Sequence, residues 1–469
     1  MNSYKTIFSS LVAVAILSGC SMAPTLETPQ IELPQAHTNA VSIEQMWWKQ
    51  FNDPILNTLI EEALNNNADI KLSALRVLKA RQAYGLSDSA LYPTLNATAG
   101  GSKQQTSDET YPNKEKGGAR YKDFNLGLTL GYEIDFWGKL SSQADSNWAS
   151  YLSTKAAAQT VRNTLINEII LAYFNLASLD ERIRVLDQTA LAYQQSYEFR
   201  LKQYQLGSTN ELLVNQTKAQ YNNTLAAKET LLEAKKIQES ALAILLGKSP
   251  AAFFNQSLQF SPTLPKPLSI PAGLPSSLLE NRPDIAEALE NLKSKNALIG
   301  VEKASYFPSI SLTGSYGQQS DSLDNILKSS ATRWSFGPSL SVPIFDFGRI
   351  KTRVAISETD LQSALVSYEQ TVKKAYKEVS DALARQASAQ NRIAFAKEEV
   401  DAYKKTYSLA TTRYDVGATS SLEVIDAQKN LLNATLTLIS TQQTLLASQA
   451  ELFKALGGGW NNTLLLEEK

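Results

Sequence analysis

Two acidic pairs are the side chains of this 469-residue sequence whose spacing could support chemistry. Glu133 and Asp135 flank Ile134, and two steps along an extended strand place both carboxylates on one face, about 7 Å apart. Paired carboxylates can hydrolyse a glycosidic bond, but no convergent polar site surrounds this pair. Glu423 and Asp426 are three residues apart, on one face of a helix. Taken alone, that second pair is typical of a solvated helix face.

Other reactive residue types are scarce. One His and one Cys exclude the common transition-metal cages, Cys/His nucleophile pairs and disulfide frameworks. With 45 Lys+Arg against 46 Asp+Glu, the chain lacks the basic footprint that nucleic-acid binding requires. We therefore expect no enzyme activity, no cofactor, no metal site and no nucleic-acid partner. A structural or conduit role is favoured.

The single cysteine lies at the end of a targeting segment. Lys5 precedes a short apolar run over residues 11–17, which is typical of a secretory signal and too short to span a bilayer. The next residues, Ser18-Gly19-Cys20, complete a pattern that resembles a bacterial lipobox. The alternative is an ordinary signal peptide with an incidental cysteine. We predict a signal peptide over 1–19, lipid on Cys20 and, because Ser21 follows, anchoring in the outer membrane.

The rest of the chain contains an internal two-fold sequence repeat. Five landmarks of the first half recur about 210 to 215 residues later. They include Tyr92-Pro93 with Phe307-Pro308, and Leu206-Gly207-Ser208-Thr209 with Val416-Gly417-Ala418-Thr419. We predict a lipidated extended segment at 20–45, a first copy at 46–250, a proline-rich linker at 251–275, a second copy at 276–459 and a tail at 460–469.

Each copy predicts a helix, two strands, a very long helix, a turn and a second long helix. The clearest strands alternate apolar and small or polar residues, from Phe124 to Tyr132 and from Trp334 to Ile344. A soluble sandwich would explain this alternation equally well, and so would the lipid-facing and lumen-facing residues of a membrane barrel. No Pro or Gly interrupts residues 139–206 or 349–416. Helices of that length measure on the order of 100 Å and must project from a compact fold.

The helical and strand patterns together constrain the assembly. Apolar residues recur every three or four positions from Val161 to Ala190 and from Ile393 to Tyr414, which is the spacing of a coiled-coil seam. Four strands cannot close a barrel, and open strand edges are not tolerated in lipid. A membrane barrel would therefore be shared among several copies of the chain.

This order of elements resembles the outer-membrane efflux family of TolC-like ducts, in its lipoprotein branch. The resemblance is carried by the segment 47–56, by Arg282-Pro283-Asp284-Ile285 and by Tyr306-Phe307-Pro308. It implies a homotrimer with a 12-stranded barrel over a periplasmic α-helical tunnel. It also implies docking to a periplasmic adaptor and an inner-membrane RND-type pump, so that drugs or other small solutes leave through the duct. A duct for type I protein secretion, a periplasmic adaptor lipoprotein and an anchored enzyme are the alternatives.

The resemblance also implies roles for residues near the two turns between long helices. Glycine suits the left-handed end of the first helix, and Ser or Thr can cap the second, so a plain helical corner explains the sequence. The family implies that these tips face the adaptor, through Leu206, Gly207, Ser208, Val416, Gly417 and Ala418.

The resemblance further implies a periplasmic gate beside the second tip. Glu423 and Asp426 would join the carboxylates of two other chains in a ring, whereas the first copy has Leu213 and Gln216 at the matching positions. Tyr414 matches a residue that ties the closed gate through its hydroxyl. Thr419 stands where some relatives of the family carry an Arg whose charge locks the gate. That charge is absent from this sequence.

Overall fold

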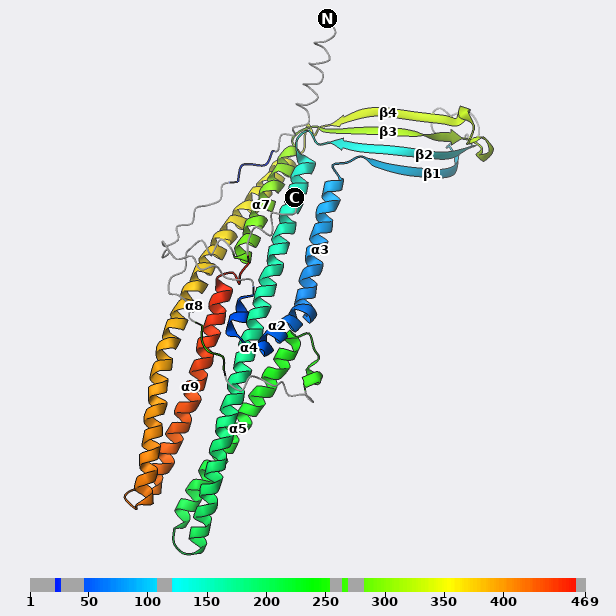
Figure 1. Cartoon of the computed structure of the whole chain (residues 1–469). Helices are drawn as coiled ribbons and strands as arrows, with labels where there is room; N and C mark the ends of the chain where they lie inside the picture. The colour runs from blue at the N-terminus through cyan, green and yellow to red at the C-terminus, as the bar shows by residue number, and fades with distance from the viewer. Residues whose placement is uncertain (1–21, 27–45, 108–119, 254–263, 269–281, 461–469) are drawn as a thin grey trace. The chain divides into compact units, whose positions relative to one another are not determined.

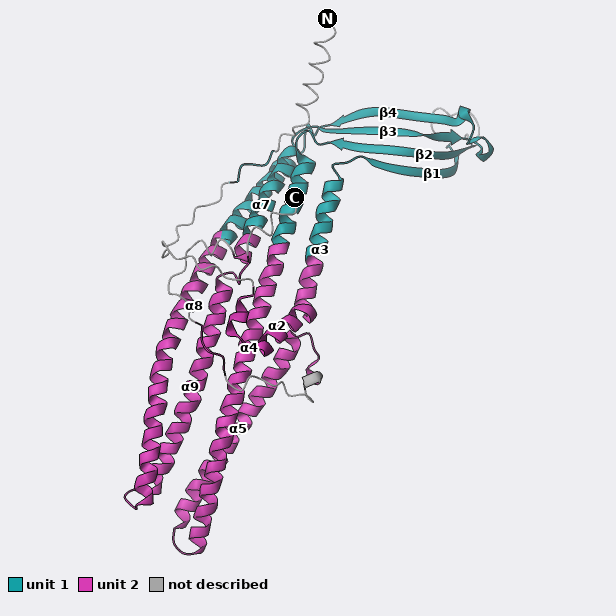
Figure 2. Ribbon diagram, viewed as in Figure 1, with its two compact units in different colours: residues 1–30, 77–154, 288–368 teal, residues 31–76, 155–287, 369–469 magenta. Residues whose placement is uncertain are grey.

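The computed structural model describes residues 22–26, 46–107, 120–253, 264–268 and 282–460 (Figure 1). The chain divides into two compact units (Figure 2). Unit 1 comprises residues 1–30, 77–154 and 288–368, and unit 2 comprises 31–76, 155–287 and 369–469. Each unit takes segments from both sequence copies. The predicted boundaries of the copies therefore remain predictions about the sequence, and Cys20 lies outside the described residues.

The predicted order of elements is observed in both copies. The first copy contains η1 (Trp47–Phe51), α2 (Pro54–Asn66), α3 (Ala68–Ser89), β1 (Thr94–Gln105), β2 (Arg120–Ile134), α4 (Lys139–Gln205), α5 (Glu211–Leu245) and η2 (Pro250–Phe253). The second contains α7 (Pro283–Ala304), β3 (Ser309–Ser320), η3 (Leu323–Asn325), η4 (Ser329–Ala331), β4 (Thr332–Ser341), α8 (Arg349–Asp415) and α9 (Ser421–Ala455). Across the described residues, none of these helices is long and apolar enough to cross a membrane.

The four strands form one sheet in the order β1-β2-β3-β4, and every neighbouring pair is antiparallel. The pair β2–β3 joins the two sequence copies, because β2 belongs to the first and β3 to the second. The fold class predicted from the sequence, mainly helical with four β-strands per chain, is confirmed.

The prediction for β4 was too long. The alternation of apolar and polar residues predicted a strand that continues to Ile344, whereas β4 ends at Ser341. Pro343 lacks the backbone N–H that a ladder needs, and Asp346 already caps the next helix by accepting hydrogen bonds from the backbone N–H groups of Gly348 and Ile350. Val342 and Ile344 therefore lie in the corner between β4 and α8.

Unit 2 has a core of aromatic and aliphatic side chains. Trp47 of η1 stacks on Phe453 of α9, with ring centroids 4.7 Å apart, and Phe51 meets Phe174 of α4 edge to face at 5.1 Å. Asp53 caps α2 by accepting from the backbone N–H of Ile55, and its other oxygen accepts from a buried tyrosine hydroxyl of α4. The segment after the predicted lipidated stretch is therefore anchored in this core.

The predicted seam of α4 is buried. Eight of its nine positions, from Leu165 to Ala190, are less than a tenth exposed. The seam of α8 is only half-buried, with Ala396 and Ala410 inside and the others intermediate. The seam prediction is thus confirmed for α4, while in α8 the seam positions are covered only in part by this chain.

Arg282, from the motif before α7, is a buried clamp in unit 2. Its guanidinium donates to both oxygens of Asp284 at 2.9 and 2.7 Å, to Glu378 of α8 at 2.7 Å and to the backbone oxygen of Ala455 at 2.7 Å. Burial lowers the pKa of Arg282, but hydrogen bonds and charge from the two carboxylates outweigh it and raise the pKa overall. One side chain therefore ties α7, α8 and α9 together.

Candidate functional site

The sheet has two chemically different faces, because neighbouring residues of an extended strand point to opposite sides. The registers align Leu95 with Leu130, Leu128 with Tyr316, and Tyr316 with Trp334. One face is consequently apolar from β1 to β4; we call it the apolar face. About half of its large apolar side chains are exposed, and the others are half-buried. Trp334 is 72% exposed and Leu340 65% exposed. An apolar sheet face that the described residues leave exposed requires an apolar neighbour.

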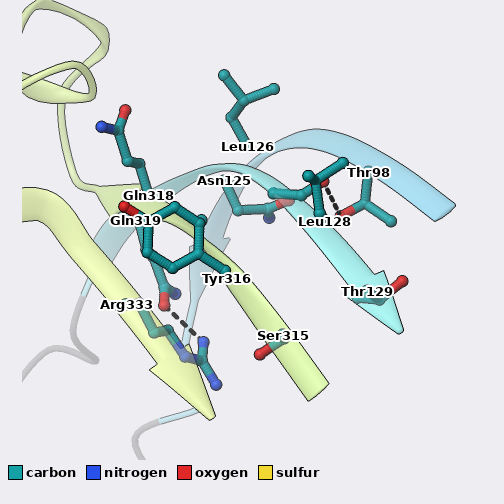
Figure 3. Close-up of a pocket in the computed structure, with 12 residues that line it drawn as sticks. Thr98, Asn125, Leu126, Leu128, Thr129, Ser315, Tyr316, Gln318, Gln319 and Arg333 are labelled. Carbon is teal, nitrogen blue, oxygen red and sulfur yellow. Dashed lines mark hydrogen bonds between the residues drawn. The ribbon is translucent and has the colours of Figure 1, made fainter. Parts of the chain in front are cut away.

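The opposite face, the polar face, carries Ser, Thr, Asn, Gln and Gly at almost every position. One of its rows runs Thr98, Gly127, Gly317 and Arg333 across the four strands. Figure 3 shows Arg333 reaching Gln319, with a hydrogen bond of 2.6 Å. Gln319 in turn donates to Asp123 of β2 at 2.6 Å. Gly317 leaves room for this row, because a Cβ there would meet the backbone of Leu126 and Gly127 at 2.4 to 2.5 Å.

The first acidic pair has a structural role at the start of α4. The two oxygens of Asp135 accept hydrogen bonds from the backbone N–H groups of Leu140 and Ser141, both at 2.8 Å. The Glu133 Oε1 atom lies 4.0 Å from the Nζ atom of Lys139. Helix capping therefore accounts for Asp135 without any substrate.

Both tips end their first helix in the same way. In tip 1, Gly207 has φ +72° and donates to the Tyr204 oxygen, while the N–H of Ser208 donates to the Gln203 oxygen. In tip 2, Gly417 has φ +75°, and the corresponding bonds run from Gly417 to Tyr414 and from Ala418 to Arg413. This pair of bonds is a Schellman motif. The left-handed glycines predicted from the sequence are confirmed.

The predicted caps of the second helices were partly wrong. Asn210, rather than Ser208 or Thr209, caps α5 by accepting from the backbone N–H of Leu213 at 3.1 Å. The hydroxyl of Ser208 instead donates back to the Gln203 oxygen. Ser420 occupies the cap position of α9 without a side-chain bond, and the Thr419 hydroxyl is buried with no partner among the described residues. The second helices begin at Glu211 and Ser421, so each cap position lies one residue beyond the four-residue motif from which the caps were predicted.

The other predicted tip and gate residues are accessible. Leu206 is 83% exposed and Val416 75% exposed at the two tips. Glu423 and Asp426 are both exposed in the first two turns of α9. Asp426 accepts one long contact, 3.4 Å from the side-chain amide of Asn430. Both carboxylates are thus accessible beside tip 2, and their role in a gate remains a prediction.

Tyr414 contacts Arg200, a residue that was not among the site residues predicted from the sequence. The guanidinium of Arg200, from α4, lies 4.8 Å from the centroid of the Tyr414 ring. Arg200 is only 8% exposed, and it also donates to Gln203 at 2.8 Å. A signal was present, because the three-four spacing that contains Ala190 and Tyr193 continues to Arg200 and predicts burial there. One arginine therefore contacts the last turn of both long helices.

Long helical hairpins combined with a sheet that has one apolar and one polar face are typical of a membrane channel protein. The family model for outer membrane efflux proteins matches residues 59–248 and 274–458. The chain is 35% identical over 463 residues to a cation efflux system protein, CusC of Escherichia coli O6:H1, covering 96% of this chain and 97% of the relative. It is 33% identical over 468 residues to the probable outer membrane lipoprotein SilC of Salmonella typhimurium, covering 97% and 99%.

A solved structure agrees with these relatives. The Campylobacter jejuni CmeC outer membrane channel superimposes with a TM-score of 0.90 at 28% identity, covering 95% of this chain and 96% of that one. The chain belongs to the outer membrane efflux protein family. It is an outer-membrane channel component of an efflux system, with a TolC-like fold.

Proposed function

We propose that three copies of this chain form a duct in the outer membrane that passes drugs or other small solutes outward from a periplasmic adaptor and an inner-membrane RND-type pump. The observation that carries the proposal is the two-faced sheet. Its apolar face suits lipid and its polar face suits a water-filled lumen.

The sheet's edges support a shared barrel. Within the described residues, β1 pairs only with β2 and β4 only with β3, so one edge of each lacks a partner. Unpaired backbone groups cost several kcal/mol each in lipid. Pairing β4 of one chain with β1 of the next removes both edges, and three chains supply twelve strands.

The long helices support the same assembly. Apolar side chains of α8 are exposed in the single chain, including Val366 at 64% and Phe395 at 69%. Exposed apolar groups repeated along a helix are expected at contacts between subunits. The trimer would bury them between neighbouring hairpins.

The tips and the acidic pair receive their roles from this assembly. The exposed Leu206 and Val416 lie on short loops held by rigid helices, as expected for adaptor contact. Three copies of Glu423 and Asp426 would bring six carboxylates to the periplasmic mouth, where they would attract cations. Lipid on Cys20 would fix the N-terminal end of each chain to the same membrane.

Three measurements test the proposal. Sedimentation in detergent should give three chains per particle, and intact-mass spectrometry should show a chain that starts at Cys20 with added acyl mass. Planar-bilayer recording should show ion conductance that changes when the cognate adaptor is added. A monodisperse monomer with intact strand content would overturn the shared barrel. An unmodified N-terminus would overturn the lipid anchor alone.

A further inference from the structure

The charged residues of the sheet's apolar face are all cations and all lie at one end. In the described strands this face carries Lys103 of β1 with Arg120 and Lys122 of β2, and it carries no Asp or Glu. All three lie at the ends of β1 and β2 farthest from α3 and α4 in the chain. The polar face, by contrast, has Asp123 and Arg333 at the same end.

Two of these cations face each other directly. Lys103 and Lys122 are register partners in the antiparallel pair β1–β2, which brings their Cβ atoms to about 5 Å. Like charges directly opposite in a sheet are destabilising. Both side chains are exposed, and neither has an acidic partner among the described residues. Among the described residues nothing offsets this repulsion, so an anion bound between the two ammonium groups would stabilise the arrangement.

The cations begin where the apolar band ends. From Ile134 to Phe124 the apolar face of β2 is uncharged, and ten residues of a strand rise about 33 Å. At the strand tilt of a membrane barrel, about 40°, this corresponds to the ~25 Å height of a lipid-facing band. Lys122 and Lys103 follow at the outer boundary of that band.

We propose that Lys103, Lys122 and Arg120 form a binding site for the phosphate groups of a phosphorylated lipid in the outer leaflet of the outer membrane. This proposal rests on the proposed function, because it takes the apolar face to be the lipid-facing side of the barrel. Two lysines and an arginine complement the nearly dianionic charge of a phosphate monoester, which a zwitterionic phosphodiester lipid lacks. The adjoining apolar band receives the acyl chains of the same lipid, which a free phosphate ion cannot use. Arg120 is held toward the site by its hydrogen bond to Gln105 at 3.0 Å.

The experiment measures lipid retention on the purified full-length protein. The probes are a bisphosphorylated lipid A and phosphatidylcholine, added to detergent solutions and counted per chain by native mass spectrometry. The variant is Lys103→Gln/Lys122→Gln. The matched control is Arg333→Gln, which removes a cation at the same end of the sheet from the opposite face. We expect the double variant to retain lipid A at least about tenfold more weakly than the unmodified protein. The control should retain lipid A as the unmodified protein does, and all three proteins should retain phosphatidylcholine equally.

Thermal melting separates this site from a structural role. Without anionic lipid, the double variant should melt at the same temperature as the unmodified protein or higher, because the like-charge pair is gone. With lipid A, the unmodified protein should gain more stability than the variant. Equal retention in all three proteins would overturn the proposal. So would complete competition by inorganic phosphate at matched ionic strength, which would indicate a site for free anions. Bilayer conductance of the same samples tests the duct separately, since both variants should still conduct.

Discussion

The two longest helices, α4 and α8, have the same length and are buried differently. Each is the first helix of its hairpin, spans 67 residues and contains no Pro or Gly. Helix α4 buries Ile169, Tyr173 and Phe174 completely within its own chain. The buried positions of α8 are mainly alanines, and its larger apolar residues, such as Ile356 and Phe395, remain more than half exposed. One repeated pattern therefore packs into the chain's own core in the first copy and leaves large apolar side chains exposed in the second.

Replacing one phenylalanine in each helix is the strongest test of this difference. Phe174→Ala should cost about 3–5 kcal/mol of unfolding free energy, because it leaves a cavity in the core. Phe395→Ala should change the stability of a single chain by no more than about 0.5 kcal/mol. It should instead weaken self-association, because Phe395 would be buried only against a neighbouring chain.

Melting in detergent and sedimentation over a range of protein concentrations measure the two effects. The comparison fails if Phe395→Ala destabilises the isolated chain as much as Phe174→Ala does. It also fails if the trimer persists unchanged at every concentration.

The second prediction concerns the clamp that joins α8 to α7 and α9. Arg282→Gln should destabilise unit 2 by about 3 kcal/mol, since it leaves Asp284 and Glu378 together without their cation. The matched control is Arg385→Gln, which removes a surface pairing with Glu451 at 3.1 Å from an arginine whose side chain is 57% exposed. Surface pairs contribute about 0–1 kcal/mol. Similar melting temperatures for the two variants would show that the Arg282 network adds little.

The third prediction uses the contact between the two copies near the tips. Arg200→Met keeps much of the side-chain volume and removes the cation beside the Tyr414 ring. A partly desolvated cation–π contact contributes about 0.5–2 kcal/mol, and we expect a loss of that size together with faster hydrogen exchange at both tips. Arg184→Met on the same helix is the control, because its side chain is 53% exposed. Equal exchange in the two variants would remove Arg200 as a link between the hairpins.

Periodicity was enough to predict much of the fold. The sequence indicated both long helices, the strand pairs and the glycine turns, because spacing and backbone conformation depend on local chemistry. Which face of α8 is covered, however, depends on side chains from other segments or chains. The end of β4 was missed for a local reason, since Pro343 and the Asp346 cap outweighed the apolar alternation.

The site was predictable where exposure follows from composition, and not where it depends on distant contacts. Glu423 and Asp426 lie on an exposed helix face, as two acidic residues three apart suggested. Arg200 was missed because arginine is usually exposed, and its burial depends on Tyr414, more than 200 positions away along the chain. The Asn210 cap was missed because α5 begins at Glu211, one residue later than the predicted Ser208 and Thr209 caps allow.

The smallest expected effect on the fold belongs to the acidic pair of α9. Glu423→Gln/Asp426→Asn should change the unfolding free energy by no more than about ±0.5 kcal/mol, because both side chains are exposed. If three chains bring these carboxylates together, removing their charge should nevertheless weaken cation preference and reduce block by divalent or trivalent cations. Glu211→Gln in the first turn of α5 is the matched control, an exposed carboxylate at the corresponding tip of the first copy. Planar-bilayer recordings of reversal potential and cation block compare the three proteins. If all three behave alike, these carboxylates only keep the helix soluble, and the two tips differ in sequence without differing in function.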